Sequence, residues 1–156
     1  MNFVGLDLSL TSSGLVILAE DCSILSQKLI SSPTKESIEY RISYVASQIL
    51  SEIKQYEPHI ICIEGLSFGS HGQATLDLAG LNLYVRTCLY NESKKFYVIT
   101  PTVLKKYVTG TGKAKKELML LKVYKKFGVE FESSDLCDAY TLSRYCKDNY
   151  GDKQNA

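Results

Sequence analysis

The sequence has few of the residues that build histidine or cysteine metal sites. It contains two histidines and five cysteines among 156 residues, and no two cysteines are spaced as Cys-x-x-Cys. Two histidines exclude a histidine-rich metal site, while an odd number of widely spaced cysteines argues against a zinc site or a disulfide framework. We therefore predict that the cysteines are buried free thiols.

Long apolar stretches free of charge are also missing, and the amino terminus lacks a basic segment that leads into an apolar core. These absences predict no membrane-spanning helix and no signal peptide, and we expect a cytoplasmic protein. The apolar content of 45% is ordinary for a globular protein. We expect one domain over residues 1–156, with a frayed polar tail at about 149–156.

The net charge of +1 conceals a strongly basic region. Residues 94–126 hold ten lysines and one acid, Glu117, which amounts to +9, so the remainder of the chain carries −8. A basic region on a nearly neutral chain indicates a surface that faces a polyanion. For any single lysine, solvation of a helix face is the simpler interpretation.

Hydrophobic patterning predicts five strands and five helices. The strands are expected at residues 3–8, 15–20, 22–30, 60–64 and 96–99. The helices are expected at residues 38 to about 58, 73–90, 101–108, a lysine-rich segment that ends at 128, and 133 or 134 to about 147. Thr100 followed by Pro101 is typical of a helix start, and Gly128 of a helix end.

The order of these elements, β-β-β-α-β-α-β-α-α-α, predicts an α/β fold. We expect a mixed five-stranded sheet, in which a three-stranded meander is followed by β-α-β crossovers, with helices on both faces. The residues expected to face the core are Leu76, Ala79, Gly80 and Leu83 in the second helix, Leu118, Leu121, Val123 and Tyr124 in the lysine-rich helix, and Leu136, Ala139, Leu142 and Tyr145 in the last.

Two of the predicted buried strands carry a carboxylate near their carboxyl ends. Asp7 lies near the end of the first strand, and Glu64 ends the strand at 60–64. A buried carboxylate is costly unless it is paired, hydrogen-bonded or bound to a metal. If these strands are parallel neighbours, about 4.8 Å apart, both side chains emerge at one sheet edge, where one cation can bridge them.

Asp135 and Asp138 lie three residues apart at the start of the last helix, so both project from one face. For Asp135, an equally good interpretation is that it complements the positive amino end of the helix. Four carboxylates close together cannot all ionise at neutral pH without a compensating cation, and all-oxygen ligands suit Mg²⁺ or Mn²⁺. Two such ions can activate water and stabilise the leaving oxygen in phosphodiester cleavage.

Over nearly its whole length the sequence resembles the RuvC-type Holliday junction resolvases of the ribonuclease H-like superfamily. The matching elements are Gly5-Leu6-Asp7-Leu8-Ser9 with Thr11 and Gly14, Ile63-Glu64 followed by Phe68, the lysine-flanked turn at 108–112, and Asp135-Leu136-Cys137-Asp138-Ala139. The resemblance implies a homodimer that resolves four-way DNA junctions by paired symmetric nicks, leaving 5′-phosphate and 3′-hydroxyl ends. It assigns metal binding and catalysis to Asp7, Glu64, Asp135 and Asp138.

The resemblance also implies the DNA contacts. Phe68 occupies the position of an aromatic residue that stacks on bases at the crossover. Lys105 and Lys116 match lysines beside the scissile phosphate, with Lys113 and Lys115 as further phosphate contacts. Asn82 and Tyr84 lie on the helix expected to form the dimer interface. The small size and compact tail resemble phage-encoded members.

Three alternatives stay open. A nuclease of this fold with broader specificity for branched DNA fits the same residues, as does a module that binds junctions without cutting, although all four acids are present. The Gly-x-Asp motif followed by Thr, Ser and Gly also resembles the phosphate loop of actin-like proteins and sugar kinases. Those proteins need two such domains around a nucleotide, and this chain is too short for two, so we expect no nucleotide cofactor.

Overall fold

The computed structural model of the protein describes residues 1–57, 59–67 and 72–151. Its strands are β1 (Asn2–Asp7), β2 (Ser13–Leu18), β3 (Ile24–Ile30), β4 (His59–Glu64) and β5 (Phe96–Ile99). Its helices are α1 (Ile38–Lys54), α2 (Gln73–Asn91), α3 (Pro101–Thr109), α4 (Lys116–Phe127) and α5 (Ser134–Tyr150). Every predicted element is present, with boundaries shifted by a few residues.

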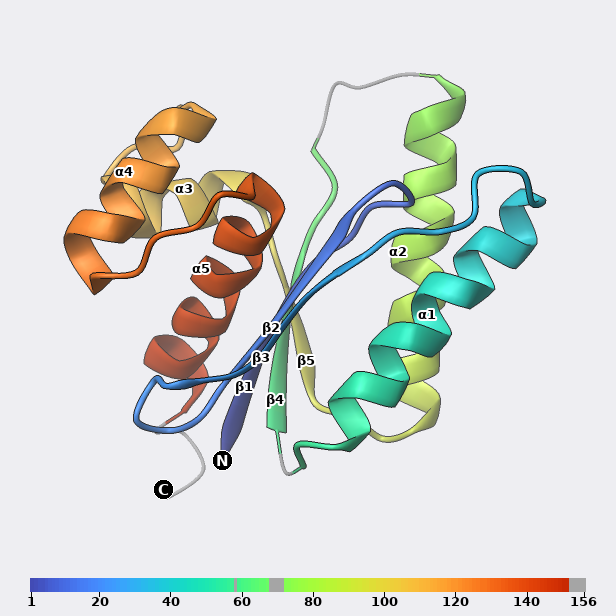
Figure 1. The fold of residues 1–156 in the computed structure, drawn as a ribbon, viewed down its shortest axis with the longest axis horizontal. Helices are drawn as coiled ribbons and strands as arrows, with labels where there is room; N and C mark the ends of the chain where they lie inside the picture. The colour runs from blue at the N-terminus through green and yellow to red at the C-terminus, as the bar shows by residue number, and fades with distance from the viewer. Residues whose placement is uncertain (58, 68–71, 152–156) are drawn as a thin grey trace.

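The strands form one mixed sheet in the order β3-β2-β1-β4-β5 (Figure 1). β1 is antiparallel to β2 and parallel to β4, and β4 is parallel to β5. The pairing of Leu6 with Ile63 brings the carboxyl ends of β1 and β4 side by side. The predicted α/β fold is confirmed, and its two strand-end acids lie at the same edge of the sheet.

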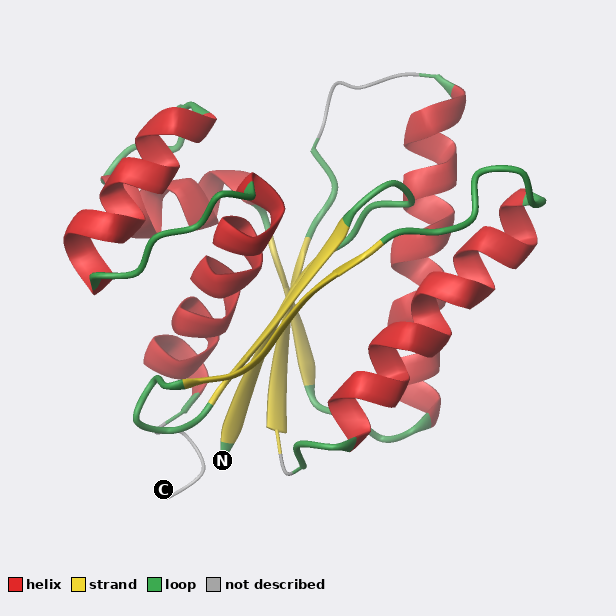
Figure 2. Cartoon of the chain, viewed as in Figure 1, coloured by secondary structure: helices red, strands yellow, loops and turns green. Residues whose placement is uncertain are grey.

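Helices cover both faces of the sheet (Figures 1 and 2). On one face, α1 and α2 pack through a cluster that includes Val45, Ile49 and Leu81. On the other, α5 lies directly against the sheet, and α3 and α4 pack outside it. Because α5 lies between the sheet and the α3–α4 layer, it is buried on several sides, and the five consecutive residues 139–143 are all buried.

Two glycines let α5 approach the sheet closely. A Cβ atom on Gly5 would lie 1.9 Å from the backbone oxygen of Ala139, and one on Gly14 would lie 2.2 Å from the backbone oxygen of Asp135. Both obstacles are main chain, so no side-chain rotation relieves them. Glycine at these two positions therefore determines how near the first turns of α5 come to β1 and β2.

The predicted inward faces of α2 and α4 were partly wrong. In α2 the buried residues are Leu81, Asn82, Val85 and Leu89, whereas Leu76 and Leu83 are 66% and 61% exposed. In α4 the buried residues are Met119 and Val123, whereas Leu121 and Tyr124 are exposed. Apolar residues occur on several sides of both helices, so spacing alone does not select the face that packs. The inward residues of α5 were predicted correctly.

Helix starts follow the expected chemistry in three of the five helices. The side chains of Ser37, Thr100 and Ser133 accept hydrogen bonds from the backbone of the first turns of α1, α3 and α5. The starts of α2 and α4 have no such side-chain bond. Ser133 is therefore the residue that caps α5, at the helix end that carries Asp135 and Asp138.

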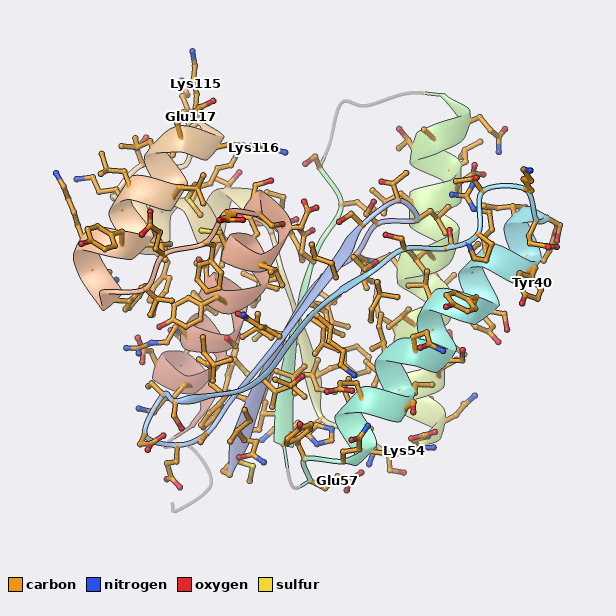
Figure 3. All side chains as sticks on the ribbon, in the orientation of Figure 1. Tyr40, Lys54, Glu57, Lys115, Lys116 and Glu117 are labelled. Carbon is orange, nitrogen blue, oxygen red and sulfur yellow. The ribbon has the colours of Figure 1, made fainter. Side chains whose placement is uncertain are left out.

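The five cysteines are free, and Cys62, Cys137 and Cys146 are fully buried, while Cys22 and Cys88 are half-buried. Among the described residues, no helix is long and apolar enough to cross a membrane. Two ion pairs, Lys54 with Glu92 and Lys94 with Glu57, lie at the end of the molecule opposite Lys115 and Lys116 (Figure 3). The lysines of the basic region thus occupy two different ends of the fold.

Candidate active site

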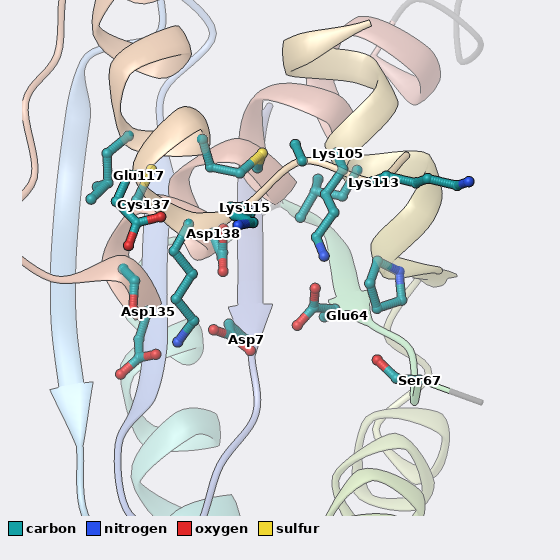
Figure 4. Close-up of a pocket in the computed structure, with 17 residues that line it drawn as sticks. Asp7, Glu64, Ser67, Lys105, Lys113, Lys115, Glu117, Asp135, Cys137 and Asp138 are labelled. Carbon is teal, nitrogen blue, oxygen red and sulfur yellow. The ribbon is translucent and has the colours of Figure 1, made fainter. Parts of the chain in front are cut away.

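Four carboxylates from both ends of the chain meet at one edge of the sheet. Asp7 ends β1, Glu64 ends β4, and Asp135 and Asp138 lie in the first turns of α5. All four line one cavity of about 730 Å³. Figure 4 shows them around the same hollow, with Asp7 between Glu64 and the two aspartates of α5. The predicted set of acids is therefore brought together.

Lysines form the opposite wall of this catalytic cavity. Lys105 projects from α3, while Lys113, Lys115 and Lys116 come from the turn before α4 and its start. The positive amino end of α4 borders the cavity, and no side chain caps it. All four predicted lysines thus line the same cavity as the acids, and the charges of Lys105 and Lys116 act on Glu64. Phe68, the predicted stacking residue, lies outside the described residues.

Burial and the repulsion between neighbouring acids raise the pKa values of Asp7, Glu64 and Asp138. Burial, followed by the charge of Glu64 and a hydrogen bond shared with it, raises the pKa of Asp7 to about 9. Burial and the charge of Glu64 raise the pKa of Asp138 to about 7. Burial also raises the pKa of Glu64, against the hydrogen bond from Asp7 and the charges of Lys105 and Lys116. The positive charge of the lysines is therefore too small to keep all of these carboxylates ionised at neutral pH.

The donor set fits a divalent cation. These carboxylates supply hard oxygen ligands, and their raised pKa values indicate that the cavity has too little positive charge for all of them to ionise. Among the described residues, no three acidic, histidine or cysteine side chains already converge closely enough to hold an ion. Binding a cation would therefore require the carboxylates to rotate toward it.

Asn82 holds the strand end that carries Glu64. Its side-chain amide donates a hydrogen bond of 3.0 Å to the backbone oxygen of Glu64, and the residue is only 4% exposed. Asn82 therefore faces the sheet. That α2, the helix that carries Asn82 and Tyr84, forms a dimer interface stays a prediction. The sequence contained a signal for this inward position. Asn82 lies beside Leu81 and three residues before Val85, two apolar residues that are both buried.

Replacing Asn82 is expected to displace Glu64. In Asn82→Leu the Glu64 carbonyl loses its donor, which should cost about 1–3 kcal/mol of unfolding free energy and lower the cleavage rate about 10- to 100-fold. Junction affinity should stay within twofold, about 0.4 kcal/mol. Thermal unfolding, gel-based cleavage and anisotropy binding measure these quantities. Asn91→Leu, at an exposed position of the same helix, is the matched control, and equal loss of cleavage in both variants would contradict this role.

The fold and the site define a class. A mixed five-stranded sheet with carboxylates at the ends of β1 and β4 and on α5, facing lysines, is the arrangement of a ribonuclease H-like nuclease. A family model, Crossover junction endodeoxyribonuclease RuvC, matches residues 3–143. The chain therefore belongs to the RuvC family of crossover junction endodeoxyribonucleases, which are metal-dependent nucleases.

Individual relatives agree with this assignment. The chain is 30% identical to the crossover junction endodeoxyribonuclease RuvC of a Sulfurovum strain over 148 residues, 92% of each chain. Its fold is similar to that of Thermus thermophilus RuvC in complex with a Holliday junction substrate, with a TM-score of 0.78 and 21% identity over 92% of this chain and 90% of that one. The yeast mitochondrial Holliday junction resolvase is a more distant structural relative, with a TM-score of 0.59 and 15% identity over 90% of this chain and 76% of that one.

Proposed function

We propose that this crossover junction endodeoxyribonuclease uses Asp7, Glu64, Asp135 and Asp138 to hold the metal ions that cleave four-way DNA junctions. The observation that carries the proposal is the meeting of these four carboxylates in one cavity opposite four lysines. Two bound Mg²⁺ ions, for which Mn²⁺ can substitute, supply an activated water and stabilise the leaving oxygen. The products are 5′-phosphate and 3′-hydroxyl ends. Residues 1–156 act as a single nuclease domain.

The lysines orient the scissile phosphate. Lys105 and Lys116 are the cations whose charges act on Glu64, so they lie where a phosphate bound near that acid would be neutralised. Lys113 and Lys115, both exposed, add positive charge to the same side of the cavity, where they can bind further phosphates of the DNA strand. The uncapped amino end of α4 adds backbone N–H donors. In this proposal Phe68 stacks on bases at the crossover.

Neutralising Lys105 and Lys116 should weaken junction binding in a salt-dependent way. For Lys105→Gln/Lys116→Gln, losing two phosphate contacts should flatten the slope of log affinity against log salt by about 2 units. Anisotropy titrations between about 50 and 200 mM salt, in an Asp7→Asn background that cannot cleave, measure the slope. The control Lys54→Gln/Lys94→Gln removes the same charge from lysines paired with Glu92 and Glu57. Equal slopes for the two double variants would show that Lys105 and Lys116 do not contact DNA phosphates.

A homodimer is supported by the outward face of α2. Leu76, Leu83 and Tyr90 follow one another at intervals of seven residues, so they lie along one side of the helix, and they are 66%, 61% and 75% exposed. Arg86 and Thr87 lie beside Leu83 and Tyr90 around a shallow depression. An apolar stripe of this kind is typical of a helix that packs against a partner. A second copy would place two active sites on one junction, as paired nicks require.

Charge on this stripe is expected to separate the dimer. Leu83→Glu should convert the protein to monomers at micromolar concentration and reduce paired cutting about tenfold or more, because a buried unpaired carboxylate costs several kcal/mol. Light scattering after size-exclusion chromatography measures the mass, and a cruciform plasmid distinguishes linear from nicked products. Leu29→Glu, on the edge strand β3 and 48% exposed, should leave both unchanged. A dimeric Leu83→Glu protein would contradict this interface.

A cleavage panel tests the proposed function. Four-way, three-way, flap and linear DNA are incubated with and without Mg²⁺, and the cuts are mapped to single nucleotides. We expect symmetric nicks in the four-way junction that require the metal and carry 5′-phosphates. Equal cutting of all branched forms would indicate a broader branched-DNA nuclease, and binding without cutting would indicate a junction-binding module. Either result overturns the proposal of selective resolution.

A further inference from the structure

A second cavity continues from the catalytic one on the far side of the acid pair. This side cavity has a volume of about 320 Å³ and shares Asp7, Glu64 and Ser67 with the catalytic cavity. Its other walls come from the segment after β4 and from the first two turns of α2, including Leu66, Thr75 and Leu78. A group that passes the acids from the lysine side therefore enters this space.

The two cavities differ in charge. Four lysines line the catalytic cavity, whereas no lysine, arginine or histidine is among the described residues that line the side cavity. Among the described residues that line the side cavity, the two shared acids are the only ionisable side chains. A phosphate placed there would have no lysine, arginine or histidine among the described lining residues to neutralise it, unlike a phosphate in the catalytic cavity. The side cavity therefore suits an uncharged group.

The chemistry of its walls narrows the class of ligand. Leu8, Leu66 and Leu78 provide apolar surface, while the hydroxyls of Ser67 and Thr75 provide hydrogen-bonding groups. The volume is at the lower end of that of small-molecule sites, about 300–1,000 Å³, which is suitable for one planar heterocycle and its sugar. Apolar surface beside a few polar groups is the usual way to hold a nucleobase outside a stack.

DNA chemistry connects the two cavities. Phosphates alternate with uncharged nucleosides along a strand, so a scissile phosphate held between the acids and the lysines is followed directly by a nucleoside. We propose that the side cavity binds the sugar and unstacked base of the nucleotide attached to the scissile phosphate. This inference rests on the proposed function, because it needs a DNA strand in the catalytic cavity. Bases beside a junction's exchange point are already the least costly to unstack.

Filling the side cavity tests the inference from the protein side. Ala74 lines it, is exposed and lies in the first turn of α2, so Ala74→Phe can occupy the space without disturbing the core. We expect junction cleavage to fall about 5- to 100-fold, the range of one lost base contact. Junction binding should weaken by up to the same factor, because the base contact is lost, while the thermal shift on adding Mg²⁺ should not change. Gln73→Phe adds the same ring at the neighbouring exposed residue, which does not line the cavity, and should cleave normally.

Removing the base tests it from the DNA side. Junctions are made with an abasic nucleotide on the 5′ or the 3′ side of the mapped cut, and each is cleaved by the wild type and by Ala74→Phe. One abasic position should slow the wild type about 5- to 100-fold and have no effect on Ala74→Phe, because the pocket is already lost. Independent, multiplying effects, or normal cleavage by Ala74→Phe, would overturn the inference. Cleavage of the intact junction by the wild type tests the proposed function separately.

Discussion

Asp7→Asn is expected to abolish metal-dependent cleavage while leaving junction binding intact. Asp7 lies between Glu64 and the aspartates of α5, so we expect a cation bound among these acids to use it as a ligand. Asparagine keeps the shape and one oxygen but removes the charge that a divalent ion requires. We expect the cleavage rate to fall about a thousandfold. The lysine wall is unaffected, so junction affinity should remain within a factor of two, about 0.4 kcal/mol.

The same substitution should stabilise the metal-free protein. The pKa of Asp7 is about 9 in the fold, against 3.8 for an ordinary aspartate, so the folded state holds a proton that the unfolded state has lost between these values. The stability contribution of Asp7 is therefore full below about pH 4 and declines as the pH rises toward 9. At pH 8, Asp7→Asn should be more stable by about 1–3 kcal/mol, and the gain should shrink toward pH 5.

Thermal unfolding with and without Mg²⁺ distinguishes these effects. The wild type should be stabilised by Mg²⁺. The stabilisation should be larger at pH 8 than at pH 5, because the carboxylates bind the ion in their ionised form and lose their protons more easily at the higher pH. Asp7→Asn should lose most of this shift. Asp77→Asn, on α2 and outside both cavities, is the control and should keep both cleavage and the shift. Cleavage by Asp7→Asn near the wild-type rate would refute the assignment of Asp7.

Alanine at Gly5 or Gly14 is expected to damage the protein in two different ways. The added Cβ of Gly5→Ala would lie 1.9 Å from the oxygen of Ala139 and 2.6 Å from the nitrogen of Ser143, so α5 must move off the centre of the sheet. We expect the free energy of unfolding to fall by about 3–5 kcal/mol, which is most of the stability of a marginally stable domain.

Gly14→Ala should affect catalysis more than folding. Its Cβ would lie 2.2 Å from the oxygen of Asp135, in the first turn of α5 rather than in its middle. Displacing this turn by about 1 Å should cost about 1–3 kcal/mol of stability and reduce cleavage about 100-fold. Circular dichroism melts and single-turnover cleavage measure the two effects.

Gly80→Ala is the matched control for both glycine variants. Its Cβ would meet only Ile42, at an ordinary distance of 3.4 Å, in the interior of α2. We expect it to be stabilised by about 0.5–1 kcal/mol, since alanine is the better helix former. If Gly5→Ala and Gly14→Ala also melted at or above the wild-type temperature, α5 would not lie as close to the sheet as described.

The sequence by itself determined the elements, their order and the four acids. Short apolar runs ended by turn residues predicted the strands, and carboxylates at the ends of two of them required a partner, because charge inside a strand is costly. The helix starts at Thr100 and Ser133 were also predicted from the sequence, because capping is a local interaction. Each of these features depends on neighbours along the chain.

Only the tertiary structure decided which faces of α2 and α4 are buried and what the buried polar groups do. Leu83 was expected inside but is exposed, and Asn82, which was not among the predicted inward residues, is buried, because the packing of α2 against α1 and the sheet selects one of several sides of the helix. The separation of a lysine-lined cavity from one without described basic residues beside the same acids arises from six segments of the chain. Local spacing carries no record of such long-range contacts, so no pattern in the sequence revealed the second cavity.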